Sequence, residues 1–184
     1  MDIVEIVRKH VEERYYDKNS TKIVNMYDTH VKYVVEYSKQ LAEKLNADKE
    51  IVEISALLHD ISRLDGVNEN HHIDGSKYAE QFLRKHNYNE EKIKRVMHCI
   101  ITHSGSTSIP RESIEAECLA SADAMAHFRN IADMFYFVYG ELRKSSDEGK
   151  EMIKEKLERS FRKMLPEAQD IIRDKYDAAM KILE

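Results

Sequence analysis

Hydrophobic residues recur at three- and four-residue steps through most of the chain, which is the spacing of one face of an α-helix. Asn46 is expected to end the second helix, and Asp48 to start the third. The pattern predicts helices at about residues 2–16, 24–46, 49–61, 72–86, 90–103, 111–127, 130–143, 147–163 and 167–183. We therefore expect an all-α protein of about eight or nine helices.

Two polar stretches interrupt the helical pattern. Residues 62–70, SRLDGVNEN, collect Gly, Asn, Asp and Ser, and predict a loop. The stretch SGSTS, which contains Gly105, separates the fifth and sixth helices and leads to Pro110. Proline followed by acidic residues is typical of a helix start, so the sixth helix is expected to begin near residue 111.

Residues 147–184 keep a helical apolar stripe and predict a helical hairpin. We find no convergent chemistry in this segment. It is expected to pack on the core of the same chain, and a second copy in a homodimer is the alternative. With 184 residues, the chain is long enough for one compact domain over residues 1–184 and short for two.

Composition and charge exclude several classes of protein. The chain has 34 acidic and 29 basic residues, a net charge of -5, and no basic stripe, so polymeric nucleic acid is not an expected partner. A small anionic substrate remains compatible, because local cations and a metal can dominate the potential of a cleft. No apolar run approaches the ~20 residues of a membrane span, so no membrane partner is expected. The acidic N-terminus is unlike a secretory signal, and the chain is expected to be cytoplasmic, with Cys99 and Cys118 as reduced core thiols.

Ionisable side chains lie on apolar helical faces at two places. His30 continues the apolar stripe of Tyr27 and Val34, so its ring is expected to point inward, as a metal ligand or a hydrogen-bonded core histidine. His59 and Asp60 end the apolar run SALLHDI, where burial of an ionisable pair is costly without a partner. A divalent cation near the helix end is one such partner. The alternative is a buried histidine beside an aspartate that helps to end the helix.

Asp123 lies among small residues in the segment ECLASADAMAHF. It shares a helical face with Leu119 and Ala126, and a carboxylate on such an inward face should be paired or metal-bound. The small neighbours would also let another helix approach closely. An ion pair with a single Arg or Lys is the alternative.

Further histidines fall at the ends of predicted helices. His71 and His72 open the fourth helix, and His103 closes the fifth beside the Ser/Gly loop. His98 is expected either beside His103 or on the solvated surface. Structural or surface roles are expected for the remaining histidines, His10, His86 and His127.

The order His30, His59-Asp60, Asp123 resembles the H…HD…D signature of the HD superfamily of metal-dependent phosphohydrolases. The likeness covers residues 20 to 130. ALLHDISR is similar to the usual ALLHDIGR, HHIDGSKYA is similar to HxxxGAxxA, and IITHS precedes EAECLASADAM. The chain lacks the GYP motif of cyclic-diguanylate phosphodiesterases and a stringent-response synthetase domain, and it is much shorter than the large deoxynucleotide triphosphohydrolases.

The resemblance implies an orthogonal helix bundle with one divalent ion, such as manganese, magnesium, cobalt, nickel or iron. His30, His59, Asp60 and Asp123 would be its ligands, a mixed nitrogen and oxygen set that suits such ions. Some HD enzymes carry two metals, and His71 and His103 could then be additional ligands, with His72 and His98 as neighbours. Without a further bridging acid we favour one metal, with His71 and His103 contacting phosphate or transferring protons.

The resemblance also implies attack of metal-activated water on phosphorus, in a nucleotide or another small phosphate ester. The activity would be that of a phosphomonoesterase or pyrophosphohydrolase. Arg63 and Lys77 are candidate phosphate-binding residues, with solvated surface cations as the competing interpretation. The alternative function is a non-catalytic HD module that binds a nucleotide or a protein partner.

Overall fold

The computed structural model describes residues 2–17, 25–66, 69–105 and 107–184, and these residues form helices without a strand. One predicted helix start and two predicted loops fall partly outside the described residues, at Val24, at Val67 and Asn68, and at Ser106. The predicted all-α class is confirmed. In chain order the elements are α1 (Ile3–Tyr16), η1 (Tyr27–Val31), α2 (Lys32–Lys44), α3 (Lys49–Leu58), η2 (Ile61–Asp65), α4 (His71–Lys85), α5 (Glu90–Thr102), α6 (Ile114–Arg129), α7 (Ile131–Phe135), η3 (Tyr136–Glu141), α8 (Ser146–Arg162) and α9 (Pro166–Ile182).

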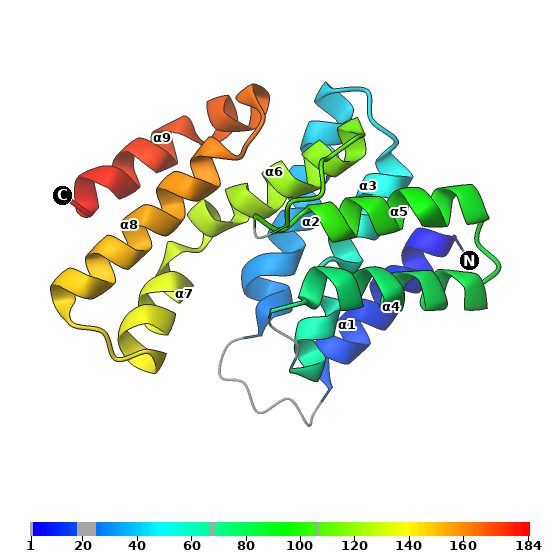
Figure 1. The fold of residues 1–184 in the computed structure, drawn as a ribbon, viewed down its shortest axis with the longest axis horizontal. Helices are drawn as coiled ribbons and strands as arrows, with labels where there is room; N and C mark the ends of the chain where they lie inside the picture. The colour runs from blue at the N-terminus through cyan, green and yellow to red at the C-terminus, as the bar shows by residue number, and fades with distance from the viewer. Residues whose placement is uncertain (1, 18–24, 67–68, 106) are drawn as a thin grey trace.

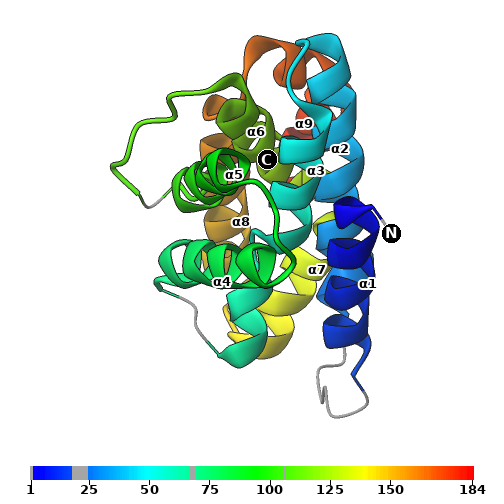
Figure 2. The same ribbon diagram turned by 90° about the vertical axis from the view of Figure 1, so that its right-hand side faces the viewer.

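Helix α3 lies at the centre of the bundle and is buried continuously from Ile51 to Leu58. It contacts α1, α2, α5 and α6, so its apolar residues fill the core from several sides. Helices α4 and α5 lie side by side on one flank, and the α8–α9 hairpin packs against α6 on the other (Figures 1 and 2). The ends of α3, α4 and α5 therefore face the same region as α6 and α8.

Capping residues set the start of several helices. The Asp48 side chain accepts hydrogen bonds from the backbone N–H groups of Glu50 and Ile51, at 3.2 and 3.3 Å, which starts α3 as expected. Asn46 takes a left-handed φ of 55° in the turn after α2. Helix α8 begins with a capping box between Ser145 and Glu148.

Three predicted boundaries differ in the structure. Helix α6 begins at Ile114, not near residue 111, because the Ser113 hydroxyl accepts a hydrogen bond from the Ala116 N–H at 3.2 Å and caps the helix there. The helix predicted over residues 49–61 ends as α3 at Leu58, and the predicted loop 62–70 begins within the 3-10 helix η2, Ile61–Asp65. The predicted helix 130–143 is the short helix α7 followed by the π-helix η3. A second π-helix, η1, carries His30.

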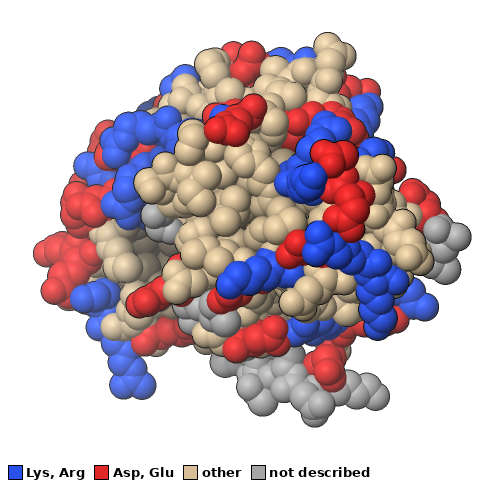
Figure 3. All heavy atoms as spheres, turned by 45° about the vertical axis from the view of Figure 1, so that its right-hand side comes forward, with Lys and Arg blue, Asp and Glu red and all other residues tan. Residues whose placement is uncertain are grey.

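The surface carries charges of both signs. Figure 3 shows one face on which Lys and Arg side chains are interspersed with Asp and Glu around a central region without charged residues. Within the described ranges, no helix combines the length and the hydrophobicity that a membrane span requires.

Gly75 allows α4 to approach the end of α3 closely. A methyl group at this position would lie 3.2 Å from the backbone carbonyl oxygen of His59 and 3.5 Å from a side-chain carbon of Ile100. Both neighbours belong to buried parts of the structure. The glycine in the HHIDGSKYA segment therefore sets the distance between the helix that carries His71 and the end of the helix that carries His59.

We expect Gly75→Ala to lower the free energy of unfolding by about 1–2 kcal/mol, although alanine favours helix, because the His59 carbonyl cannot move without shifting a buried helix end. Chemical denaturation would measure this change. Gly140→Ala is the control, since its added methyl group would meet only the Tyr136 ring at 3.4 Å. A Gly75→Ala protein as stable as the wild type would contradict the close-packing role.

Candidate metal centre

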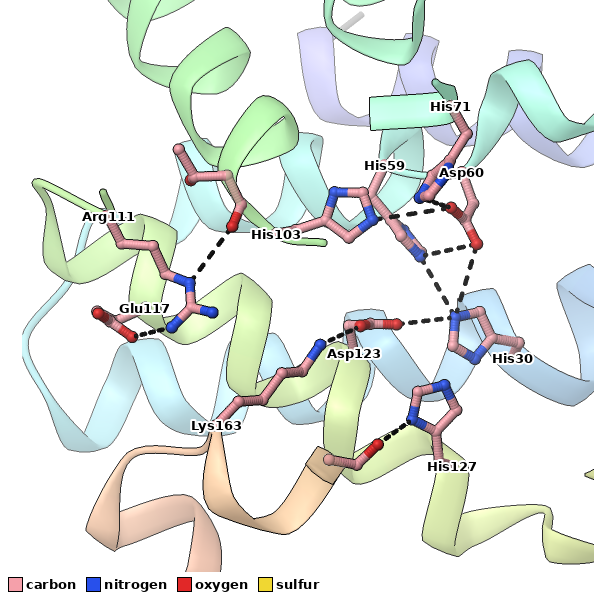
Figure 4. Close-up of polar contacts among 12 residues, drawn as sticks. His30, His59, Asp60, His71, His103, Arg111, Glu117, Asp123, His127 and Lys163 are labelled. Carbon is pink, nitrogen blue, oxygen red and sulfur yellow. Dashed lines mark hydrogen bonds and ion pairs between the residues drawn. The ribbon is translucent and has the colours of Figure 1, made fainter. Parts of the chain in front are cut away.

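The carboxylate of Asp60 lies inside a ring of histidines. Asp60 follows α3 and is 5% exposed. The Nε2 atoms of His59, His71 and His103 lie 3.6, 3.5 and 3.8 Å from its oxygens, and that of His30 lies at 3.9 Å. The four rings come from η1 and from the ends of α3, α4 and α5, and they converge on one point (Figure 4).

Backbone carbonyls fix the orientation of two of these rings. Nδ1 of His59 donates to the Ala56 carbonyl at 2.8 Å, and Nδ1 of His103 donates to the Ile100 carbonyl at 2.6 Å. Because Nδ1 carries the hydrogen, each Nε2 keeps a lone pair directed at the cluster. Burial lowers the pKa of His59, and it lowers the pKa of His103 to about 3, so both rings are neutral near pH 7.

Asp60 is ionised despite its burial. Burial acts to raise the pKa of its carboxyl group, but the nearby His59 ring and Arg63 guanidinium outweigh that effect and lower the pKa. Arg63 Nε donates to Asp60 Oδ1 at 2.8 Å, and its Nη2 lies 3.1 Å from His71 Nε2. Arg63 therefore binds both the central carboxylate and one of the surrounding rings.

Asp123 approaches the cluster from the opposite side, on α6. Its Oδ1 lies 3.3 Å from His30 Nε2, and its Oδ2 accepts a hydrogen bond from Lys163 Nζ at 2.8 Å. Burial acts to raise the pKa of Asp123, but Lys163 and His30 outweigh it and hold the pKa well below the usual value. Helices α2 and α6 pack closely here, as the small residues around Asp123 predicted.

The geometry fits a divalent ion. Donor atoms of His30, His59 and Asp60 lie within 4.8 Å of one another, and the two imidazole Nε2 atoms are 3.3 Å apart. Neighbouring ligands of an octahedral ion at 2.0–2.1 Å are about 3 Å apart, so small movements would complete the coordination. Asp123 Oδ1, beside His30, could supply a fourth ligand.

A second group of potential ligands consists of Asp60, His71 and His103. It shares Asp60 with the first group. The guanidinium of Arg63 donates to Asp60 and lies beside His71 Nε2, so an ion bound there would be repelled by a fixed positive charge. This contact favours the single-metal arrangement.

Some residues singled out from the sequence, Lys77, His98 and His72 among them, belong to neither donor group. Lys77 is exposed on α4, with its Nζ 3.7 Å from Asp74. His98 accepts a hydrogen bond from the Glu112 N–H at 3.0 Å. His72 is buried against the His71 ring, and within the described part of the chain its Nδ1 has no hydrogen-bond partner.

Three other residues that line the centre were not singled out. The His127 ring stacks on His30 at 5.7 Å between centroids, and its Nδ1 is 3.1 Å from the Ser160 hydroxyl. Lys156 and Lys163 reach the site from α8, so the expectation that residues 147–184 carry no convergent chemistry was wrong. The available signal was their seven-residue spacing, which places both lysines on one helical face.

A cavity of about 250 Å³ opens onto these groups, and its lining combines Asp60, Asp123 and several rings with three cations, Arg63, Lys156 and Lys163. Desolvation and the neighbouring cations Lys163 and Arg159 lower the pKa of Lys156, although Asp123 opposes this shift. The three cations bring positive charge to the space beside the donor atoms, which suits an anionic ligand.

Comparison with known proteins identifies a family. A family model described as HD domain matches residues 27–127, more than half of the 184-residue chain. The matched range includes His30, His59, Asp60 and Asp123 and ends at His127. A search of curated proteins finds no significant match.

Solved structures share the fold. Bacillus subtilis YpgQ has 21% identity and a TM-score of 0.75, over 98% of this chain and 91% of its own. The structure of YpgQ in complex with ADP has a TM-score of 0.71 and 21% identity, over 98% of this chain and 93% of its own. A predicted HD superfamily hydrolase from an uncultured Thermotogales bacterium has a TM-score of 0.56 and 22% identity, over 85% of this chain and 91% of its own. At these identities the likeness shows the fold alone.

The neutral histidines predict a pH-dependent stability for the metal-free protein. His103 has a folded pKa of about 3 and an ordinary value of 6.5, so below pH 6.5 the unfolded chain binds more protons. The free energy of unfolding should therefore fall as the pH decreases from 6.5 to 4.5. Chemical denaturation in EDTA should show that His103→Gln removes roughly 2 kcal/mol of this change.

His86→Gln removes a histidine outside the cluster and is the matched control. Equal slopes for the wild type and His103→Gln would show that His103 does not carry the pH dependence. The window lies above 3.8, the ordinary pKa of an aspartate in the unfolded chain, so proton uptake by Asp60 and Asp123 contributes little within it.

Proposed function

The chain belongs to the HD domain family, whose members are generally metal-dependent hydrolases, and on that premise we propose that it hydrolyses a nucleotide or another small phosphate ester. The observation that carries this proposal is the juxtaposition of His30, His59, Asp60 and Asp123 with a cation-lined cavity. The four side chains suit a divalent metal, and the cation-lined cavity suits a phosphate.

The four proposed ligands are two neutral imidazoles and two carboxylates, which suits ions such as manganese, magnesium, cobalt, nickel or iron. When bound, such an ion supplies Lewis acidity, which lowers the pKa of water and polarises a phosphoryl oxygen. The backbone hydrogen bond of His59 holds its Nε2 lone pair ready for coordination. Lys163 holds Asp123 in its ionised form through their contact at 2.8 Å.

The remaining polar groups would bind and orient the phosphate. Arg63, Lys156 and Lys163 surround the cavity, and their charges would offset the charge on a phosphate and that developing on the leaving group. His103 is neutral and its Nε2 lone pair faces the cluster, so it can accept a hydrogen bond from water beside the phosphorus.

Among small phosphate esters, we favour nucleotides as the class of substrate. YpgQ, which shares the fold, is known in complex with ADP. The cation-lined cavity of this chain continues into a larger apolar cavity that could hold the rest of a nucleotide. A phosphomonoesterase or a pyrophosphohydrolase activity would each fit this arrangement.

His59→Ala and Asp60→Ala should each abolish metal binding and lower the rate of phosphate release by at least about a thousandfold, because each removes a proposed ligand. Metal analysis and a phosphate-release screen with nucleotides and each candidate ion would measure both effects. Lys77→Ala, on the exposed face of α4, is the control.

Unchanged phosphate release in both variants would overturn the proposed mechanism. Metal binding and nucleotide-dependent thermal stabilisation of the wild type, without turnover with any candidate ion, would instead support a non-catalytic binding module.

Lys156→Met should raise the KM of an anionic substrate about tenfold or more while leaving the metal content unchanged, because the lysine lines the cavity but is not a proposed ligand. Steady-state kinetics and metal analysis would separate the two effects. Lys154→Met on the same helix, outside both cavities, is the matched control. An unchanged KM for Lys156→Met would show that Lys156 of α8 does not contribute to phosphate binding.

A further inference from the structure

A cavity of about 810 Å³ adjoins the metal centre, between η1, the end of α6, and α7, η3 and α8. It shares His30, Arg63, His127 and Lys156, together with Met26, with the smaller cavity of about 250 Å³. A molecule bound at the centre can therefore extend from one space into the other. The larger volume lies in the range of sites that enclose small organic ligands.

Apolar and aromatic residues make up much of the lining that the larger cavity does not share with the smaller one. Tyr136 and Phe137 of η3 line it and remain 39% and 46% exposed, beside Met134 of α7 and Met152 of α8. Exposed neighbouring aromatic rings are unfavourable in water, and they become favourable when another flat ring stacks on them. Methionine side chains adapt readily to such a ring.

The charged groups that line the larger cavity differ between the part shared with the smaller cavity and the rest. Arg63 and Lys156 line the part that it shares with the smaller cavity, so phosphate is favoured there. Asp133 of α7 and Glu141 of η3 line the larger cavity alone, and Arg159, which also lines it, has its Nη1 3.3 Å from the Glu155 carboxylate. Carboxylates repel phosphate and only accept hydrogen bonds, so they favour a neutral group with N–H donors.

We infer that the larger cavity binds the nucleobase of the substrate against Phe137 and Tyr136, and that Asp133 and Glu141 select bases that carry an amino group. The amino groups of adenine, cytosine and guanine donate hydrogen bonds, whereas uracil and thymine present a carbonyl oxygen at the corresponding position. The ribose hydroxyls are common to all nucleotides of a series and do not contribute to this selection. The inference deepens the proposed function and rests on it for the phosphate end of the ligand.

Binding of ligands that cannot be cleaved tests this assignment independently of turnover. We would titrate the manganese-loaded full chain with the α,β-methylene analogues of ADP and UDP, and with methylenediphosphonate, which lacks a nucleoside. The adenosine analogue should bind about tenfold more tightly than the uridine analogue, which corresponds to one well-formed hydrogen bond to a charged group.

Phe137→Ala should weaken binding of the adenosine analogue by about tenfold or more through the loss of base stacking. Its affinity for methylenediphosphonate should stay unchanged. Phe137 is not part of the buried core, so this variant should fold, and its thermal unfolding midpoint would verify that. Glu141→Gln combined with Asp133→Asn should bring the adenosine and uridine affinities together. Glu151→Gln, on the exposed face of α8, should not.

Equal binding of all three ligands, or an equal loss of all three in Phe137→Ala, would overturn the inference. So would retention of the adenosine preference after both carboxylates are replaced. These results are distinct from failure of the proposed function, because a protein that shows the predicted affinities without releasing phosphate would keep the nucleobase site and lose the hydrolase assignment.

Discussion

The buried carboxylate of Asp60 is the constraint on which the rest of the structure depends. A charge that is 5% exposed is tolerable only if a partner compensates it, and here the Arg63 guanidinium does so, while the surrounding histidine rings present donor atoms for a cation. Those rings come from different helices, whose ends must therefore meet at one place. Gly75 lets α4 come close enough to α3 for His71 to join them.

Much of this arrangement could be predicted from the sequence. The apolar periodicity located the helices, because a helix that packs on a core must present a continuous apolar face. His30, His59, Asp60 and Asp123 were singled out because ionisable residues in apolar segments need partners, and the resemblance to the HD superfamily joined them into one proposed ligand set. His71 and His103 were identified at helix ends, and the structure brings both to Asp60.

The rest depends on contacts between segments that are distant in the sequence. Lys156 and Lys163 look like ordinary surface lysines of an amphipathic helix until α8 is placed against α6. His127 lies one helical turn after Asp123, but its role depends on the position of the His30 ring. Lys77 shows the opposite case, since its helix is near the site and its side chain faces solvent. The distinction between α- and π-helical turns also left no clear signal in the periodicity.

The two π-helices have an evolutionary consequence. Each accommodates one more residue per hydrogen-bonded turn than an α-helix does, and η1 and η3 both contribute to the larger cavity. Deleting one residue from either would convert the wide turn into an ordinary one and rotate the preceding side chains relative to the following ones. Single-residue insertions and deletions in these two segments would thus reshape the larger cavity while leaving the flanking helices in place, and they should appear as one-residue gaps when distant relatives are aligned.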